Sequence, residues 1–495
     1  MKIDIPREIA LKALYKIEKE NAYSNLVLDE IVKENKSKLT SVDIGFISEI
    51  VYGITTYRIT LDYIISKYSN TKINKLSVFT KNILRMGIYQ IIFLSKVPKS
   101  AAVNESVNLS KKYSNKSSGF VNAILRKVNI EDYNDIDNIK DEKERISIKY
   151  SMPKWIIEEL LKEFNINKVE EICKNSNIKP RTTIRVNTIK IKQEELLEIF
   201  DKKDIKYEKS EIENFIYLKN LKNISELDEF KKGYFTVQDL AAGLTSIILN
   251  PKEGETILDA CSAPGGKTTH LAEIMNNEGK IIAWDLYQSR LNLVNENAER
   301  LGIEIIKTER KNANEFDNSL VEKFDKILLD VPCLGIGVIK RKPDIKWQRK
   351  KQDLEKIANE QIKILENCSK YLKNNGYLVY STCSILKKEN EEIIKQFLKN
   401  NKNFKKVEIN INKTYANTEM LKLYPDEKTD GFFICLLQKI TNITEIWHLY
   451  YILIKCIDFF CEKLLNNSMI FSVYYFDVLY WQKKLVFINK KRLKY

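Results

Sequence analysis

Apolar residues recur every three to four positions through the first 135 residues, which is the spacing of amphipathic helices. The pattern is clearest at 9–17 and 26–32, and it returns on both sides of Pro98. Segment 1–135 is therefore predicted to be an all-α domain. Its further predicted helices are 46–56, 61–65, 82–93, 101–113 and 119–128.

A polar, charged stretch at 136–150 is interpreted as a linker to a small α+β unit at 151–240. Pro153 stands near the first turn of a predicted helix. A strand with alternating faces is predicted at 180–187, a helix at 193–200, and an extended segment at 234–239 that leads into a helix at 240–249. Four polar residues interrupt these apolar elements, either as plain surface residues or as packing residues: Arg185, Asn187, Gln238 and Asp239.

Strand-like and helix-like segments alternate from 241 to 440, the pattern of a doubly wound parallel sheet. Strands are predicted at 256–260, 280–285, 303–308, 326–330 and 377–381. A late strand at 431–438 is predicted to be one arm of an antiparallel edge hairpin.

The remaining residues, 441–495, are rich in aromatic and apolar side chains interrupted by charges such as Lys455 and Asp458. They are interpreted either as an amphipathic helix on a partner or membrane surface or as an appended or shifted-frame tail without a native partner. The second interpretation is favoured, so the tail is predicted to be poorly ordered against the preceding domain and dispensable for activity.

The amino-acid composition indicates a polyanionic binding partner. Lys and Arg outnumber Asp and Glu by 82 to 67, which favours a nucleic-acid partner, although a codon bias towards Lys and Asn would explain part of the excess. The 495 residues contain eight cysteines and two histidines without a C-x-x-C pair, so neither a disulfide scaffold nor a metal site is expected. No signal peptide and no uncharged apolar run of about 18 residues is present, which predicts a cytoplasmic protein that does not enter a membrane.

A turn rich in Pro and Gly follows the first predicted strand of the sheet and precedes a helix. Glycines allow a ligand to lie against the backbone, and the free N–H groups of the helix start point at it. Asp285, about 20 residues further on at a strand end, suits the hydroxyls of a ribose. A dinucleotide or S-adenosylmethionine would fit, and the absence of G-x-G-x-x-G favours the second. The turn comprises Cys261, Ser262, Ala263, Pro264, Gly265, Gly266 and Lys267.

Cys333 and Cys383 follow two neighbouring predicted strands, so they are expected at one edge of the sheet. One cysteine in such a place is usually a small core residue, but two beside a cofactor turn indicate chemistry. C5 of cytosine is too weak a nucleophile to accept a methyl group unaided. Addition of a thiolate at C6 activates it, and a nearby cation would favour that thiolate.

Four segments together resemble the RNA (cytosine-5)-methyltransferases of the RsmB/NOP family: 261–267, 330–333, 340–347 and 381–383. Two others, 85–90 and 119–127, are similar to the NusB-type helical RNA-binding domain. The combination resembles the 16S ribosomal RNA enzymes of that family over about residues 4–440. This implies a Rossmann-like class I methyltransferase domain with a mostly parallel seven-stranded α/β sheet, preceded by an all-α NusB-like domain and the small α+β unit.

The resemblance also implies the chemistry and the residues that perform it. S-adenosylmethionine would methylate C5 of one cytosine in 16S ribosomal RNA, the equivalent of cytosine 967. Cys383 would be the nucleophile and Cys333 would assist product release. The turn 261–267, Asp285 and Asp330 would contact the methyl donor. Asn312 stands where the family usually has an Asp near the adenine, which is expected to weaken donor binding at most.

The expected partner is 16S ribosomal RNA, bound by a monomer. Phosphate contacts are predicted for basic residues of the helical domain, with a solvated surface as the alternative. A basic loop after Cys333 is predicted to grip phosphates and stack a base. The first group comprises Lys111, Lys112, Lys116, Arg126 and Lys127; the second comprises Lys340, Arg341, Lys342, Lys346 and Trp347.

Other functions remain open from the sequence. The alternatives are an enzyme that methylates transfer RNA or another RNA, and a non-catalytic RNA-binding or assembly factor. The two cysteines argue against the non-catalytic alternative. A DNA cytosine methyltransferase is disfavoured because those enzymes lack the Thr-Cys site.

Overall fold

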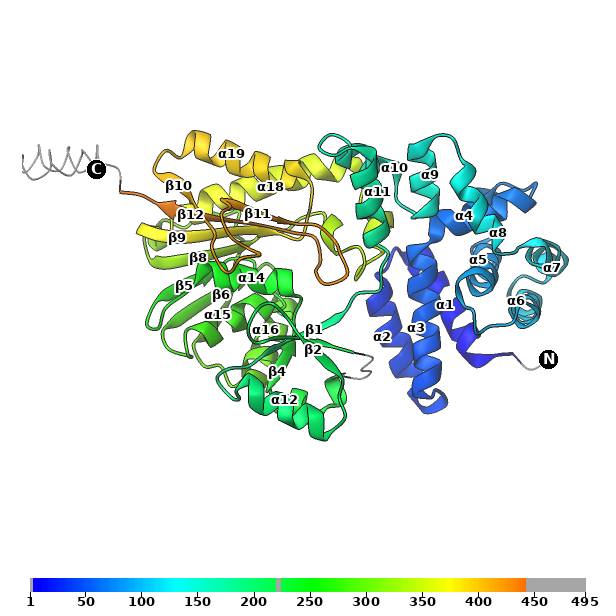
Figure 1. Cartoon of the computed structure of the whole chain (residues 1–495), viewed down its shortest axis with the longest axis horizontal. Helices are drawn as coiled ribbons and strands as arrows, with labels where there is room; N and C mark the ends of the chain where they lie inside the picture. Colours follow the sequence, from blue (N-terminus) through cyan, green and yellow to red (C-terminus); the bar gives the residue numbers. More distant parts are fainter. Residues whose placement is uncertain (1–2, 220–223, 442–495) are drawn as a thin grey trace, which may run out of the picture. The chain divides into compact units, whose positions relative to one another are not determined.

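Helices fill the N-terminal region as the apolar periodicity predicts (Figure 1). A computed structural model describes residues 3–219 and 224–441. Caps fix the helix starts: the Asp4 side chain accepts from the Arg7 N–H, and Thr40 and Asp43 form a capping box. Buried Ile, Leu and Val side chains from these helices form one core. The helices are α1 (Ile5–Glu20), α2 (Ser24–Glu34), α3 (Ser41–Thr56), α4 (Arg58–Tyr68), α5 (Val78–Phe93), α6 (Lys99–Tyr113), α7 (Ser118–Lys127) and the short α8 (Glu131–Asn134).

The linker prediction for 136–150 is wrong, because part of this stretch is the helix α9 (Glu142–Lys149). Ile146, Ser147 and Ile148 are all buried, so this helix packs on more than one side. The hydroxyl of Thr60 in α4 donates to the Ile148 carbonyl at 2.5 Å. The charged majority of α9 made it look like a linker, whereas two apolar side chains suffice to dock so short a helix.

The small α+β unit contains the predicted strand and helix. Its antiparallel sheet has the order β2-β3-β1-β4. The strands are β1 (Thr182–Val186), β2 (Tyr207–Lys209), β3 (Phe215–Leu218) and β4 (Phe235–Val237); the helices are α10 (Lys154–Leu160), α11 (Ile166–Asn175), α12 (Gln193–Lys202) and α13 (Asp228–Lys231).

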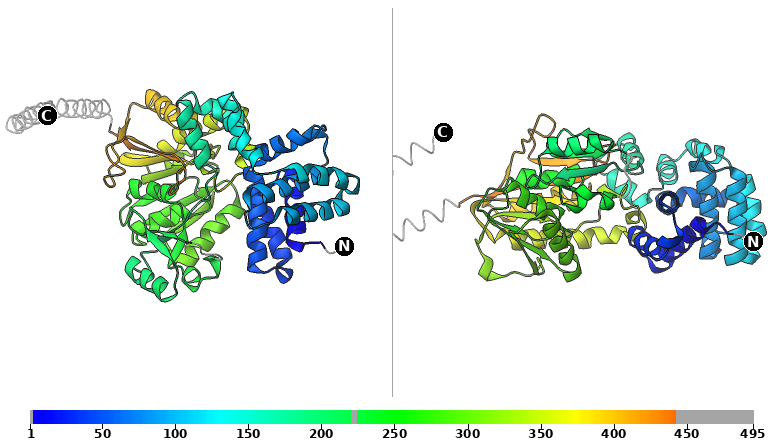
Figure 2. Two further views of the ribbon diagram at one scale, coloured as in Figure 1. Left: turned by 45° about the vertical axis from the view of Figure 1, so that its right-hand side comes forward. Right: turned by 90° about the horizontal axis from the view of Figure 1, so that it is seen from below.

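The larger sheet is mixed and mostly parallel, with the order β10-β12-β9-β8-β5-β6-β7 and β11 paired to β12. Helices cover both of its faces (Figure 2). Side chains of α14, α15 and α16 pack on one face, and those of α18 and α19 pack on the other. The strands are β5 (Thr256–Asp259), β6 (Lys280–Asp285), β7 (Ile306–Arg310), β8 (Phe324–Asp330), β9 (Leu372–Thr382), β10 (Phe404–Val407), β11 (Met420–Leu423) and β12 (Phe432–Lys439); the helices are α14 (Leu240–Leu249), α15 (Gly266–Ile274), α16 (Gln288–Leu301), α17 (Ile345–Gln348), α18 (Lys351–Ser369) and α19 (Glu391–Asn400).

Three strand predictions need correction. In the described residues the sheet has eight strands rather than seven, because β11 joins it through β12. The late strand β12 does pair antiparallel with β11, but it also pairs with β9 and β10, so it lies inside the sheet rather than at its edge. Strand β7 begins at Ile306, later than predicted. A run of apolar residues identifies a strand, but its neighbours are set by pairing with distant segments.

The basic loop at 340–347 is mostly buried, so the prediction that it grips RNA is wrong for four of its five residues. Lys340 and Arg341 pair with Asp430. Lys346 is 2% exposed and donates to the Thr56 carbonyl at 3.1 Å. The indole N–H of Trp347 donates to the Thr55 carbonyl at 2.7 Å. Of the five, only Lys342 is classed as exposed.

In the described part of the chain, no helix is long and apolar enough to cross a bilayer. The tail hypothesis for 441–495 concerns residues that, apart from Thr441, lie outside the described ranges.

Candidate active site

Two cysteines meet at the carboxyl edge of the parallel strands. Strand β8 ends at Asp330 and leads to Cys333, while β9 ends at Thr382 and leads directly to Cys383. These strands are parallel neighbours with Asp330 opposite Ser381, so both motifs emerge at the same edge. The two Sγ atoms are 3.1 Å apart, and both side chains are partly exposed. The predicted juxtaposition is confirmed, whereas the roles of the two thiols stay predictions.

A lysine from the glycine turn lies beside this pair. The Lys267 ammonium is 2.7 Å from Oδ2 of Asp330, whose Oδ1 accepts from the Ser381 hydroxyl at 3.0 Å. Burial alone would lower the pKa of Lys267, but the attraction of Asp330, with a contribution from Cys383, raises it above its usual value. Lys267 therefore stays cationic next to the cysteine pair.

The environment of Cys333 favours its neutral thiol. The hydrogen bond with Cys383 and burial raise the pKa of Cys333 well above its ordinary value. Cys333 thus keeps its proton and can donate it towards the Cys383 sulfur. The pair is chemically asymmetric: one sulfur lies near a cation, and the other is a neutral donor.

The glycine turn is held by short-range contacts. Both the N–H and the hydroxyl of Ser262 donate to the Trp284 carbonyl, at 2.8 and 2.9 Å. Gly265 has φ +102°, and a Cβ there would lie 3.0 Å from Cα of Val294, so a larger residue does not fit. The Thr268 hydroxyl donates to Asp259 at 2.7 Å and ties the start of α15 to the end of β5.

The small α+β unit contacts this turn and the helix that follows it through Arg185 of β1. Nε and Nη2 of Arg185 each lie 2.7 Å from an oxygen of Glu273 in α15, and Nη1 donates to the Gly266 carbonyl at 2.8 Å. Gln238 also accepts from Arg185, and the Asn187 amide donates to the Leu301 carbonyl at 2.8 Å. These polar residues are therefore packing residues rather than surface residues.

The residues around the turn fit S-adenosylmethionine. Asp285 ends β6 beside the turn, with Oδ1 accepting from the Tyr287 N–H at 3.0 Å and Oδ2 3.1 Å from Arg290. Oδ1 also accepts from Arg290 at 3.4 Å, so the lone pair that remains for a ribose hydroxyl is on Oδ2. Asn312 is occupied locally: its Oδ1 accepts from Asn314 and its amide donates to Glu315 at 2.9 Å.

Within the described ranges, no group of three or more His, Cys, Asp or Glu side chains is arranged to hold a metal ion.

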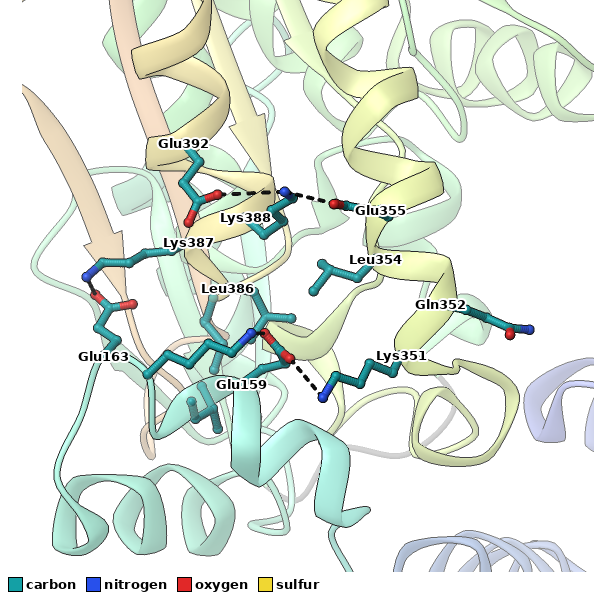
Figure 3. Close-up of a pocket in the computed structure, with 13 residues that line it drawn as sticks. Glu159, Glu163, Lys351, Gln352, Leu354, Glu355, Leu386, Lys387, Lys388 and Glu392 are labelled. Carbon is teal, nitrogen blue, oxygen red and sulfur yellow. Dashed lines mark hydrogen bonds and ion pairs between the residues drawn. The ribbon is translucent and has the colours of Figure 1, made fainter.

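A groove of about 760 Å³ lies between α10, the start of α18 and the segment after Cys383 (Figure 3). Leu354 and Leu386 contribute apolar surface to it. Its lysines are paired with glutamates: Lys388 is 2.9 Å from Glu355, and the other pairs include Lys351 with Glu159 and Lys387 with Glu163. Neither cysteine and no residue of the glycine turn lines this groove, so it is distinct from the predicted catalytic site.

Sequence reasoning missed a carboxyl group behind the cysteines. Glu389 is fully buried and accepts from the Leu334 N–H at 2.7 Å and from the Ser384 hydroxyl. It stands in the charged run 387–392, which has the composition of a solvated segment. No local signal distinguishes it from its exposed neighbours, so only the fold identifies it.

Family comparisons match almost the whole described chain in three segments. Residues 4–129 match the NusB family, 152–225 match the RsmF/B-like ferredoxin-like domain, and 246–438 match the 16S rRNA methyltransferase RsmB/F family. A protein of Bacillus subtilis named probable ribosomal RNA small subunit methyltransferase B is 37% identical over 453 residues, covering 89% of this chain and 100% of its own. One of the same name from Synechocystis is 31% identical, covering 88% and 99%.

Solved structures agree with this relationship. The crystal structure of PH0851 has a TM-score of 0.74 at 27% identity, covering 89% of this chain and 100% of its own. NSun6 from Pyrococcus horikoshii with SFG has a TM-score of 0.53 at 27% identity, covering 59% and 99%. With a curated relative matched from end to end, a NusB domain in front and paired cysteines at the sheet edge, this chain belongs to the RsmB/F family of 16S ribosomal RNA methyltransferases.

Proposed function

We propose that this protein uses S-adenosylmethionine to methylate C5 of one cytosine in 16S ribosomal RNA, at the equivalent of cytosine 967. The observation that carries the proposal is the 3.1 Å approach of Cys333 and Cys383, next to the cationic Lys267. A structural role would not require two partly exposed thiols at the edge where such sheets bind ligands.

The reaction begins with the thiolate of Cys383, which adds to C6 of the cytosine and forms an S–C6 bond. The electron pair of the C5–C6 double bond moves to C5, which attacks the electrophilic methyl group that S-adenosylmethionine supplies. A base then removes the C5 proton, the double bond re-forms, and Cys383 leaves as a thiolate. The products are 5-methylcytosine, S-adenosylhomocysteine and one proton.

The neighbouring side chains have separate tasks. Lys267 favours the thiolate form of Cys383 before attack and again when it leaves. Asp330 holds Lys267 in place and is close enough to the cysteines to reach the target base. Cys333, as a neutral thiol, donates to the departing sulfur and so assists release of the product.

The helical domain supplies the RNA contact in this proposal, and the protein acts as a monomer on ribosomal RNA. The candidate phosphate-binding residues are all exposed and lie in the last turn of α6, in the short helix η3 (Asn115–Ser117) and in the last turn of α7. They are Lys111, Lys112, Lys116, Arg126 and Lys127. Lys112 also pairs with Glu8 at 2.8 Å, which leaves it the least free of the five.

Methylation of purified 16S ribosomal RNA with labelled donor, followed by bisulfite sequencing, tests the proposal. Cys383→Ala should abolish transfer while the donor still binds. Cys333→Ala should accumulate a covalent protein–RNA complex that persists on a denaturing gel.

Turnover by Cys383→Ala would refute its role as the nucleophile, and clean turnover by Cys333→Ala would remove its role in release. Methylation of transfer RNA alone would change the substrate. Wild-type protein that binds RNA without any transfer would favour the assembly-factor alternative.

A further inference from the structure

We infer that Glu389 is a positioning residue that sets the geometry of the two active-site cysteines. The inference rests on the proposed function, since it concerns the same reaction. Glu389 touches neither sulfur. It acts on the segments that carry them. In the described ranges, it is the one side chain that accepts hydrogen bonds from the residue after each cysteine.

The contacts are arranged symmetrically about the cysteine pair. Oε1 of Glu389 accepts from the N–H of Leu334, the residue after Cys333, at 2.7 Å. Oε2 accepts from the hydroxyl of Ser384, the residue after Cys383. One planar carboxyl group therefore links both loops, and the separation of the two sulfurs depends on it.

Two amide side chains reinforce this link. Gln361 in α18 donates to the Pro332 carbonyl at 2.8 Å and to Glu389 at 3.4 Å. Asn390 donates to the Ser384 carbonyl at 2.9 Å and accepts from the Thr382 hydroxyl at 2.6 Å. The residues that flank each cysteine are thus held from behind by one connected, buried network.

Because this network is buried, water cannot replace a hydrogen bond that is lost from it. Glu389, Ser384 and Gln361 are each 0% exposed. Removing the carboxyl group would leave the Leu334 N–H buried without its acceptor, and the loops would have to move to satisfy it. The donor turn is held by other contacts, chiefly those of Arg185 and Ser262. Loss of Glu389 should therefore impair chemistry at the cysteines more than donor binding.

The test compares Glu389→Ala, Glu389→Gln and a control, Glu392→Ala, which removes an exposed carboxylate three residues further on, in the first turn of α19. Each variant is assayed for kcat, for the dissociation constant of S-adenosylmethionine and for the rate of covalent complex formation in a Cys333→Ala background. Gln keeps an oxygen for Leu334 and an amide for Ser384, so it should rescue turnover to within about fivefold of wild type. Glu389→Ala should lower kcat and the rate of covalent complex formation at least about 30-fold, with the donor constant changed less than about threefold.

Ser384→Ala is a second, milder variant that breaks one side of the link and should slow covalent complex formation about tenfold. Unchanged kcat in Glu389→Ala would overturn the inference. So would a loss of donor binding in proportion to kcat, because it would indicate a merely structural role. An inactive wild-type protein would instead refute the proposed function, which separates the two failures.

Discussion

At the scale of single residues, two buried carboxyl groups behind the site have raised pKa values. Burial raises the pKa of Glu389 to about 7, although hydrogen bonds from Ser384 and Leu334 oppose the shift. Asp259, behind the glycine turn, is raised to about 7 for the same reason. Both groups keep a proton in the folded protein that they would lose in the unfolded chain near neutral pH.

The proton that folded Glu389 retains should make the stability of the protein depend on pH. Its folded pKa of about 7 lies above the ordinary value of 4.5, so between about pH 4.5 and 7 the unfolded chain releases a proton that the folded protein retains. The free energy of unfolding therefore falls as pH rises through this window, by about 1 to 3 kcal/mol. Glu389→Gln cannot titrate. Urea unfolding at pH 5 and pH 8 should show the wild type losing that much relative to Glu389→Gln, and parallel pH profiles would contradict the assignment.

The buried ion pair between Arg185 and Glu273 gives a second prediction at this scale. Their side chains are 0% and 3% exposed. Arg185→Met should lower the free energy of unfolding by about 3 to 5 kcal/mol, because it leaves Glu273 buried without a partner. The double variant Arg185→Met with Glu273→Leu should recover part of that loss in the same chemical denaturation experiment. A double variant no more stable than Arg185→Met would mean that packing, not charge, makes the pair important.

At the scale of elements, segment 334–338, which follows Cys333, crosses close to the backbone at Gly431. The short helix η7 (Ile336–Val338) passes so close to Gly431 that a Cβ on Gly337 would lie 2.1 Å from the Gly431 carbonyl oxygen. The Gly337 N–H donates to the Cys383 carbonyl at 2.9 Å, and its own carbonyl accepts from Gly431. Backbone hydrogen bonds thus join segment 334–338 to the loop of Cys383 and to Gly431, the residue before β12.

Gly337→Ala should therefore disturb the cysteine site directly. A methyl group at this crossing must displace backbone, which typically costs about 1 to 3 kcal/mol. We expect kcat to fall at least about tenfold, with the dissociation constant of the donor unchanged by isothermal titration. Gly119→Ala is the control, because a Cβ at Gly119 meets nothing within 4 Å. Equal activity of the two variants would contradict the importance of the crossing.

Elements with local signals were predictable, and those that depend on distant partners were not. The helices of the front domain follow from their own periodicity. The meeting of the two cysteines at one edge of the sheet was also predictable, because each cysteine motif follows one of two neighbouring parallel strands. By contrast, Lys340 and Arg341 looked like RNA contacts, since their partner Asp430 is about 90 residues away in sequence. A charge in a sequence does not reveal whether another charge meets it.

At the scale of the whole molecule, the loop that begins at Cys333 ends in contact with the helical domain. Asp344 accepts from both the N–H and the hydroxyl of Ser24, at 3.2 and 2.6 Å. Lys346 bridges the Thr56 carbonyl of the helical domain to the Tyr150 carbonyl. Residues 1–439 accordingly form one compact unit. The domain proposed to bind RNA is thereby attached to the same loop that carries one active-site cysteine.

Trp347 is the side chain of this junction whose removal is most informative. Its indole N–H donates to the Thr55 carbonyl at 2.7 Å, and the Arg58 guanidinium lies 5.4 Å from its ring centre. Trp347→Ala should loosen the helical domain and raise KM for 16S ribosomal RNA about 5- to 30-fold, with donor binding unchanged. Trp347→Phe keeps an aromatic ring for Arg58, so its KM should lie between those of the wild type and Trp347→Ala. Leu26→Ala, which trims a side chain 61% exposed on α2, is the control. If Trp347→Ala instead lowers kcat at unchanged KM, the junction governs the cysteine loop rather than the placement of RNA.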